Sequence, residues 1–393
     1  MADVPAVTPQ PPPDTPETPP TPATSRGVAD KAAVQRRTLV VLPLAQVFSS
    51  LGNGSTLALG SVLAVELSGD ESWAGASTTA LGLGAALSAV PLARLAMTHG
   101  RRVALGSGLV AAIVGTFAMV AAVVLSSFAL LVLGSLLVGV ATAVNLQARF
   151  AATDLSEPAH RGRDLSLVVW AITVGAVIGP NTVGPGALLA APLGLPPYAG
   201  AFLISAIGMV IGGGVILVAL RPDPLLVRRA IDGSAPPTRA STSWAAGARI
   251  VASHRVSLAA VIGMVGAHVA MVGVMSMTPL HLAHRMHGHP EADTLTIIGI
   301  TISLHIAGMY ALSPVMGMLT DRLGPRLVTA GGLVAVLVSV ALAGLGAQYV
   351  PLVTLGLVLL GLGWSAATVA GATMLTAALP RRSAWRRRDS PTR

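Results

Sequence analysis

The sequence has no cysteine among its 393 residues. Disulfide bonds, thiolate metal sites and cysteine nucleophiles are therefore excluded. Charged residues are also scarce, at 10% of the chain, whereas a water-soluble domain needs roughly 25% to cover its surface. Because 53% of the residues are hydrophobic and the mean hydropathy is +0.74, the sequence predicts a protein embedded in lipid.

Aromatic residues make up only 3% of the chain, and no basic patch with interleaved aromatic residues occurs. The net charge of +9 and the isoelectric point of about 11.3 therefore do not indicate a nucleic-acid partner. The sequence also lacks a nucleotide-binding loop, a metallohydrolase spacing and a nucleophile constellation. We expect neither an enzyme nor a bound cofactor.

The chain instead contains a series of apolar stretches. About 20 apolar residues, at 1.5 Å each, cross the hydrocarbon core of a bilayer. We therefore expect an all-α polytopic membrane protein with about ten transmembrane helices, at residues 38–65, 73–95, 102–126, 128–149, 165–190, 197–220, 256–281, 294–318, 326–347 and 351–379.

These helices fall into two groups. Residues 1–37 are rich in Pro, Thr and Ala, without the apolar core of a signal peptide, and are expected to form a disordered cytoplasmic tail. Six helices follow in 38–220, then a cytoplasmic linker in 221–255 and four helices in 256–379. A basic cytoplasmic tail is expected at 380–393.

Basic residues are distributed unevenly among the loops. Cytoplasmic loops of membrane proteins carry an excess of Lys and Arg. With the N-terminus inside, only Arg285 of the 25 Lys and Arg residues falls outside, where the loops hold Glu66, Asp70, Glu71, Glu291 and Asp293. We expect a monomeric, multi-pass protein of the inner (cytoplasmic) membrane, in contact with the lipid bilayer and with both termini cytoplasmic.

Two loops carry related motifs. Glycine suits a tight turn, and an aspartate can cap the next helix or pair with a facing arginine, a link that breaks when two halves of a protein move. The later loop has all these residue types, and the earlier one has Met97 in place of the acid. The motif residues are Gly317, Asp321, Arg322, Gly324 and Arg326 in the later loop, and Gly100, Arg101 and Arg102 in the earlier one.

The motif resembles the signature loop of the major facilitator superfamily, although Pro325 stands where that family usually has Arg or Lys. The resemblance implies two related helical bundles around a midplane site that opens alternately to each side, in a secondary transporter of a small solute. Twelve helices are usual in that family, so a second half with four is expected to be truncated. A non-transporting remnant or a membrane scaffold is the alternative.

The fifth stretch holds Gly179, Pro180 and Gly184. Proline frees a backbone carbonyl, and glycine lets helices approach closely. This element is similar to a Gly-Pro motif of antiporters in the same superfamily, which favours efflux of a drug-like or amphipathic solute. Ordinary packing of a kinked helix is the alternative.

Polar side chains at membrane depth are candidates for binding the substrate or a coupling proton, because no stretch has an acid near its centre. For Arg149 the sequence leaves open a pair with Asp154, a pair with Asp164, or an anionic substrate. The candidates are Gln46, Asn53, Asn145, Arg149 and His268.

Methionine and histidine recur four residues apart in the seventh and eighth stretches. Met271 and Met275 share one helix face, as do His305 and Met309. Thioether sulfur and imidazole suit Cu(I), and the arrangement resembles bacterial copper importers of the same superfamily. The resemblance implies that these four side chains bind a transported copper ion, and packing around a drug-like solute is the alternative. A metal-collecting mouth is expected at His281, His284, His287 and His289.

Overall fold

The computed structural model describes residues 22–157, 160–233, 249 and 251–378, and no strand occurs in this part of the chain. The remaining parts of the predicted tails and linker lie outside it. The first group of helices comprises α1 (Pro22–Ser49), α2 (Leu51–Ser68), α3 (Ala76–His99), α4 (Arg101–Val124), α5 (Phe128–Thr153), α6 (Arg161–Ile178), α7 (Val183–Ala190), α8 (Pro197–Ala219) and α9 (Pro224–Asp232). The second comprises α11 (Arg255–Arg285), α12 (Glu291–Tyr310), α13 (Ser313–Leu323), α14 (Pro325–Leu345) and α15 (Val350–Ala378).

Nine helical segments of the described chain are long and apolar enough to cross a membrane. The first predicted span, 38–65, is not one of them, because a turn at Ser50 divides it between α1 and α2. Small and polar residues follow this turn, from Gly52 to Ser55, and lower the hydropathy of α2. The other nine predicted stretches each match one of these segments, and 38–65 is covered by the end of α1 and most of α2.

The start of α1 lies within the predicted tail. The tail at 1–37 was expected to be disordered, yet a helix begins at Pro22. Proline is accepted in the first turn of a helix, because its missing N–H would have no partner there. Further along, Gln35 Nε2 donates to the carbonyl oxygen of Ala152 at 2.8 Å, so the last turns before residue 38 are bound to α5.

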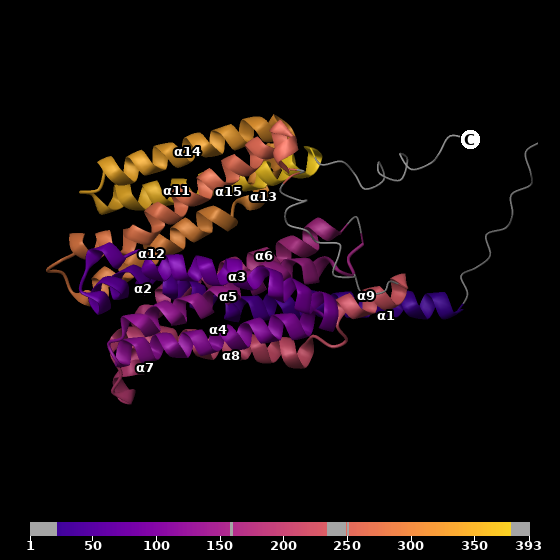
Figure 1. Cartoon of the computed structure of the whole chain (residues 1–393), viewed down its shortest axis with the longest axis horizontal. Helices are drawn as coiled ribbons and strands as arrows, with labels where there is room; N and C mark the ends of the chain where they lie inside the picture. The colour runs from indigo at the N-terminus through magenta and orange to yellow at the C-terminus, as the bar shows by residue number, and fades with distance from the viewer. Residues whose placement is uncertain (1–21, 158–159, 234–248, 250, 379–393) are drawn as a thin grey trace, which may run out of the picture.

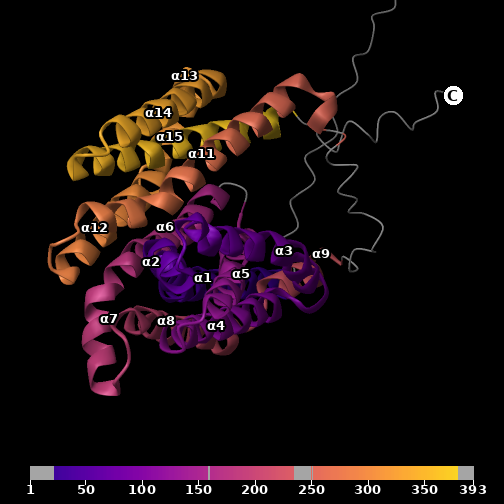
Figure 2. The same cartoon turned by 60° about the vertical axis from the view of Figure 1, so that its left-hand side comes forward.

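Glycine permits the closest helix contacts in the first bundle. A Cβ on Gly84 of α3 would lie 1.8 Å from the carbonyl oxygen of Leu136 in α5. One on Gly139 of α5 would lie 2.1 Å from that of Leu81 in α3. Side chains would force these backbones apart. The arrangement holds α5 in the centre of the bundle, in contact with α1 to α4 and α6 (Figure 2).

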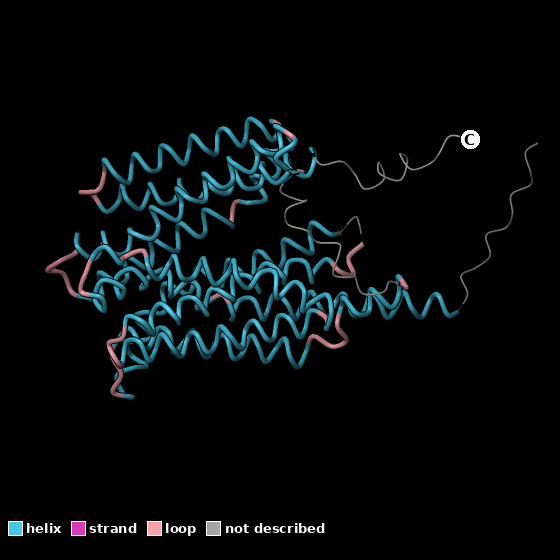
Figure 3. The backbone as a smooth tube through the Cα atoms, viewed as in Figure 1, coloured by secondary structure: helices cyan, strands magenta, loops and turns pink. Residues whose placement is uncertain are grey.

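The helices form two layers, α1 to α8 and α11 to α15 (Figure 1). We call the end with the Gly100 and Gly324 turns the basic end, and the end with Glu71 and Glu291 the acidic end. Short turns join the helices at both ends (Figure 3). Towards the acidic end the layers meet, with Asn181 Nδ2 bonded to Ser303 Oγ at 2.6 Å. Towards the basic end the layers diverge (Figure 1).

Candidate functional site

Polar side chains line the contact between α1–α2 and the antiparallel helix α5. Asn53 Nδ2 donates to Thr142 Oγ1 at 3.2 Å, and nearer to the basic end Gln35 reaches the carbonyl of Ala152. These two bonds fix the register of the helices. They place Gln46 of α1 at the level of Asn145 and Arg149 of α5.

Several polar atoms of this cluster are buried without a hydrogen-bond partner among the described residues. They are both Nε2 and Oε1 of Gln46, Oδ1 of Asn145 and Nε of Arg149. Gln46 has no exposed surface, and none of the described residues forms a hydrogen bond with its amide. A buried donor or acceptor left unpaired costs about 1–3 kcal/mol. The cluster is therefore a polar region at membrane depth whose atoms are not paired within the described chain.

One face of α5 beside this cluster is exposed. Thr142, Leu146 and Phe150 lie along it, and Leu146 and Phe150 are 44% and 49% exposed. Neighbouring helices cover the other sides of α5. The exposed stripe is therefore the side of α5 that the other helices leave uncovered.

The second layer contributes an aromatic wall. Trp364 of α15 donates its Nε1–H to Nδ1 of His268 in α11 at 3.0 Å. The Trp364 ring also meets Tyr310 of α12 edge to face, with ring centroids 5.8 Å apart. His268 is exposed and lies on the helix face of Met271 and Met275, which pack in one buried cluster with α2. His268 is therefore an exposed part of this aromatic wall, bonded to Trp364.

Arg149 lacks a partner because both candidate acids bind elsewhere. Asp154 is 2.7 Å from Arg101, and Asp164 Oδ2 accepts a hydrogen bond from Gln35 Nε2 at 2.8 Å. Across residues 22–157, 160–233, 249 and 251–378, no hydrogen bond or ion pair reaches the Arg149 guanidinium. Of the three roles expected for Arg149, the two pairs with acids are absent.

The pair of Arg101 and Asp154 holds α4 to α5 within the first layer. The guanidinium binds both carboxylate oxygens, at 2.7 and 3.1 Å, and its third nitrogen donates to Gln147 Oε1 at 2.7 Å. Burial raises the pKa of Asp154 above that of an exposed aspartate, while the hydrogen bond and charge of Arg101 lower it. The geometry is the bidentate one that Arg favours with carboxylates.

The Gly100 turn is covered by α9. Gly100 has φ +91°, and a Cβ there would lie 2.5 Å from Asp223 Oδ2. The same oxygen accepts the backbone N–H of Arg102 at 2.7 Å, and Oδ1 caps α9 through the N–H of Leu225. Arg229 of α9 donates to the carbonyl of Met97, the residue that replaces the motif acid.

The second copy of the motif has a different environment. Gly324 has φ +85° and starts α14 without a side-chain cap, so Asp321 does not cap that helix as expected. Asp321, Arg322 and Arg326 are all exposed at the basic end, where their layer lies apart from the first (Figure 1). Gly317 has open space around its Cβ position among the described residues.

At Gly179, α6 gives way to a 3-10 turn that continues into α7. The carbonyl oxygen of Gly179 accepts a hydrogen bond from Ser55 Oγ of α2 at 3.0 Å. A Cβ on Gly179 would lie 2.5 Å from the carbonyl oxygen of Leu51, so the turn packs against the backbone of α2. Gly184 meets nothing within 4 Å in the described part of the chain, and therefore does not share in this contact.

Comparisons with known proteins agree with this arrangement. The sequence profile of the Major Facilitator Superfamily matches residues 42–384. The chain belongs to the major facilitator superfamily. Two uncharacterised transporters of this type from Bacillus subtilis strain 168, YdeG and YddS, are each 33% identical to it. These matches cover 87% and 86% of this chain, and 78% and 77% of the relatives.

Other relatives have named substrates. The riboflavin transporter RfnT of Brucella anthropi is 28% identical over 88% of this chain and 82% of its own length. A mutant of the nucleoside transporter NupG has a similar structure, with a TM-score of 0.65 at 16% identity, over 87% of this chain and 84% of that one. At that identity the likeness shows the fold. Together these matches indicate a transporter rather than an enzyme.

In this major facilitator protein, three methionines proposed as metal ligands lie in one buried hydrophobic cluster, namely Met271, Met275 and Met309. His305 is fully buried, and its Nδ1–H donates to the carbonyl of Leu357 at 2.7 Å. Its Nε2 is then the lone-pair nitrogen, and that atom has no hydrogen-bond partner in the described chain. The sequence does not distinguish this buried imidazole from the exposed one of His268.

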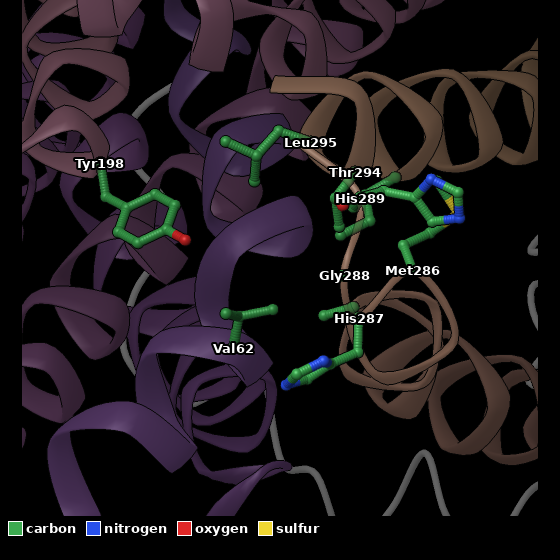
Figure 4. Close-up of a pocket in the computed structure, with 10 residues that line it drawn as sticks. Val62, Tyr198, Met286, His287, Gly288, His289, Thr294 and Leu295 are labelled. Atoms are coloured by element: carbon green, nitrogen blue, oxygen red, sulfur yellow. The ribbon is translucent and has the colours of Figure 1, made fainter. Parts of the chain in front are cut away.

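The four histidines that were expected to form a metal-collecting mouth lie apart from one another in the structure. His281 bonds the carbonyl of Ala347 at 2.9 Å, and His284 lies 3.8 Å from Glu71 of the first layer. His287 and His289 border a cavity of about 200 Å³ between the layers, and Figure 4 shows their rings on different sides of it. Among the described residues, no group of three or more His, Cys, Asp or Glu is placed to hold a metal ion.

Four residues at or beside the transporter site were missed in the sequence. Asp223 precedes Pro224, and an acid before a helix-starting proline is a helix N-terminus signal that could have revealed it. No comparable pattern in the sequence marks the other three, Ser55, Tyr310 and Trp364. Ser55 bonds Gly179, 124 residues away, and only the fold brings such residues together.

Proposed function

We propose that the chain is a secondary transporter that exports a small drug-like or amphipathic organic solute by alternating access. The observation that carries the proposal is the cluster of Gln46, Asn145 and Arg149, whose buried polar atoms lack partners beside an exposed stripe. Transporters of this type bind their substrate near the midplane, between two halves. Relatives named for riboflavin and nucleoside transport support an organic solute.

In the proposed transport cycle, the two layers would move against each other, which would close the basic end and open the acidic end. The exposed Asp321 supports this, because a charge link between the layers is expected to be open when the basic ends are apart. The turn at Gly179 and Pro180 supports export, since it resembles the antiporter motif. A proton is the proposed coupling ion, and His268 is the exposed titratable side chain of the aromatic wall.

Transport can be tested with a locked form of the same chain. Asn181 and Ser303 join the layers near the acidic end, so Asn181→Cys with Ser303→Cys permits a short bifunctional thiol cross-link in a chain that has no cysteine. Everted vesicles energised by respiration would be given riboflavin, fluorescein and rhodamine 123. We expect at least one probe to accumulate several-fold more without the cross-link than with it.

Each single-cysteine variant, treated with the same reagent, controls for chemical damage. Equal accumulation of every probe in locked and unlocked vesicles, with the protein inserted at the same level, would contradict the proposal. It would instead support the non-transporting remnant or scaffold.

Copper import is a second candidate, favoured by His305. A metal-binding histidine commonly donates its other ring N–H to a backbone carbonyl, as His305 does to Leu357. Its free Nε2 belongs to the same region as the buried Met271, Met275 and Met309, which provide the soft sulfur that Cu(I) prefers. Copper would be the transported substrate.

Cellular copper in a copper-limited host tests this second candidate. Accumulation should rise with the parent chain and be lost in His305→Ala and Met271→Ala at equal membrane abundance. Met277→Ala is the matched control, since Met277 lies on the same helix but is 43% exposed. Unchanged copper with the parent chain would exclude copper import.

A further inference from the structure

The charges of the site restrict the class of solute that it can bind. No Asp or Glu occurs in any of the ten predicted apolar stretches. A cationic solute would therefore lose its water on binding without gaining a carboxylate, which is unfavourable at low dielectric. Arg149, by contrast, is a positive charge on the first-layer wall with no acid bound to it. The wall as a whole favours a negative group.

The acids near Arg149 are already bound. Asp154 binds Arg101 through both oxygens, and Asp164 accepts from Gln35. Neither can turn to Arg149 without breaking a buried hydrogen bond. The guanidinium thus keeps its planar set of donors for a ligand, and that geometry fits a carboxylate or another planar acid better than a single-point acceptor.

The neighbouring side chains suggest the rest of the ligand. Gln46 and Asn145, at the level of Arg149, have buried amide atoms without partners in the described chain, so the surroundings of the guanidinium are polar. On the other layer, Trp364 and Tyr310 present aromatic surface held in place by their edge-to-face contact. Aromatic rings bind other flat rings by stacked or edge-to-face contact.

We propose that the substrate of this site is a flat aromatic acid. Its acidic group binds Arg149, and its ring lies against Trp364 beside His268. The inference rests on the transport function proposed above and names the substrate class of that site. Lipophilic cations, the opposite class of amphipathic solute, are expected to bind weakly.

A pair of dyes with one ring system and opposite charge tests the proposal. Fluorescein and rhodamine 123 share the xanthene ring, and their binding to the purified full chain can be measured by fluorescence polarisation in detergent. We expect fluorescein to bind about tenfold more tightly or better, the gain typical of one well-placed charged hydrogen bond. Arg149→Gln should remove this preference, and Arg149→Lys, which keeps the charge, should retain part of it.

Arg255→Gln is the matched control for removal of one positive charge, since Arg255 is exposed at the basic end, and it should leave both affinities unchanged. Equal affinity for the two dyes, no measurable binding of fluorescein, or an unchanged preference in folded Arg149→Gln would overturn the inference. Binding in detergent needs no gradient, so charge selectivity without transport in vesicles would reject only the proposed function. Transport without charge selectivity would reject only this inference.

Discussion

Single residues at the basic end determine how closely the elements of the first layer approach. Gly100 has a positive φ, and the Asp223 carboxylate lies where a Cβ of residue 100 would be. This close approach lets Asp223 accept backbone N–H groups at the start of α4 and at the start of α9. Arg101, the next residue, joins α4 to α5 through Asp154. Two adjacent motif residues thus connect three helices, and a side chain on Gly100 would disturb all of them.

Gly100→Ala should lower the free energy of unfolding by about 1–3 kcal/mol, since a positive φ strains a residue with a Cβ and the Asp223 carboxylate must also move. Thermal unfolding of the purified chain in detergent, followed by size-exclusion chromatography, measures the change. Gly82→Ala is the control, because no described atom lies within 4 Å of that Cβ position and its φ is ordinary. Equal melting temperatures of the two variants would contradict this account.

At the scale of the element, the turn between α6 and α7 connects the two layers. Pro180 lacks the N–H that a continuous helix would need, and Ser55 of α2 supplies a donor to the carbonyl of Gly179. On its other side the turn reaches α12, where a Cβ on Gly299 would lie 3.0 Å from the carbonyl oxygen of Pro180. A change in this turn therefore affects contacts with both layers.

The two glycines of the predicted kink are expected to differ. Gly179→Ala places a methyl group against the carbonyl of Leu51 and should destabilise the protein by about 1–3 kcal/mol, as overpacking does. Gly184→Ala fills open space within α7 and should be neutral or stabilising by up to about 1 kcal/mol, because alanine favours helix. The melting temperatures of both variants are compared. A larger drop in melting temperature for Gly184→Ala than for Gly179→Ala would show that the contact with α2 does not determine the stability of this turn.

The whole molecule has its layers joined towards the acidic end and apart at the basic end (Figure 1). Residues near the acidic end pair across the layers, as Asn181 does with Ser303 and His284 with Glu71. Towards the basic end, Phe150 of the first layer is half exposed. This difference between the ends predicts one-sided access to the site.

Because the chain lacks cysteine, single cysteines report access directly. Phe150→Cys should react with a membrane-impermeant maleimide applied on the basic side several-fold faster than on the acidic side. Leu345→Cys, at the end of α14 and 91% exposed, should show the reverse preference. Labelling rates in vesicles of both orientations test this, and equal rates for Phe150→Cys from both sides would contradict an opening at the basic end.

The sequence predicted the membrane class, the helices and most of their bounds, because apolar length is a local property of the chain. It also identified glycines that have positive φ in the structure, Gly100 and Gly324, since tight turns leave a local pattern. Residues 22–37 were predicted to be disordered, yet they form the start of α1, and Gln35 bonds α5, a contact that local composition does not reveal.

By itself the sequence therefore determined that the chain spans a membrane in two groups of helices, and it supplied the candidates Gln46, Asn145, Arg149 and His268. Only the tertiary structure decided which of them lack partners. Arg149 is unpaired because Asp154 and Asp164 are bound by residues distant in sequence, and His305 is buried because α15 packs over it. Pairing and burial depend on contacts between elements far apart in the chain, and these exist only once the helices have packed.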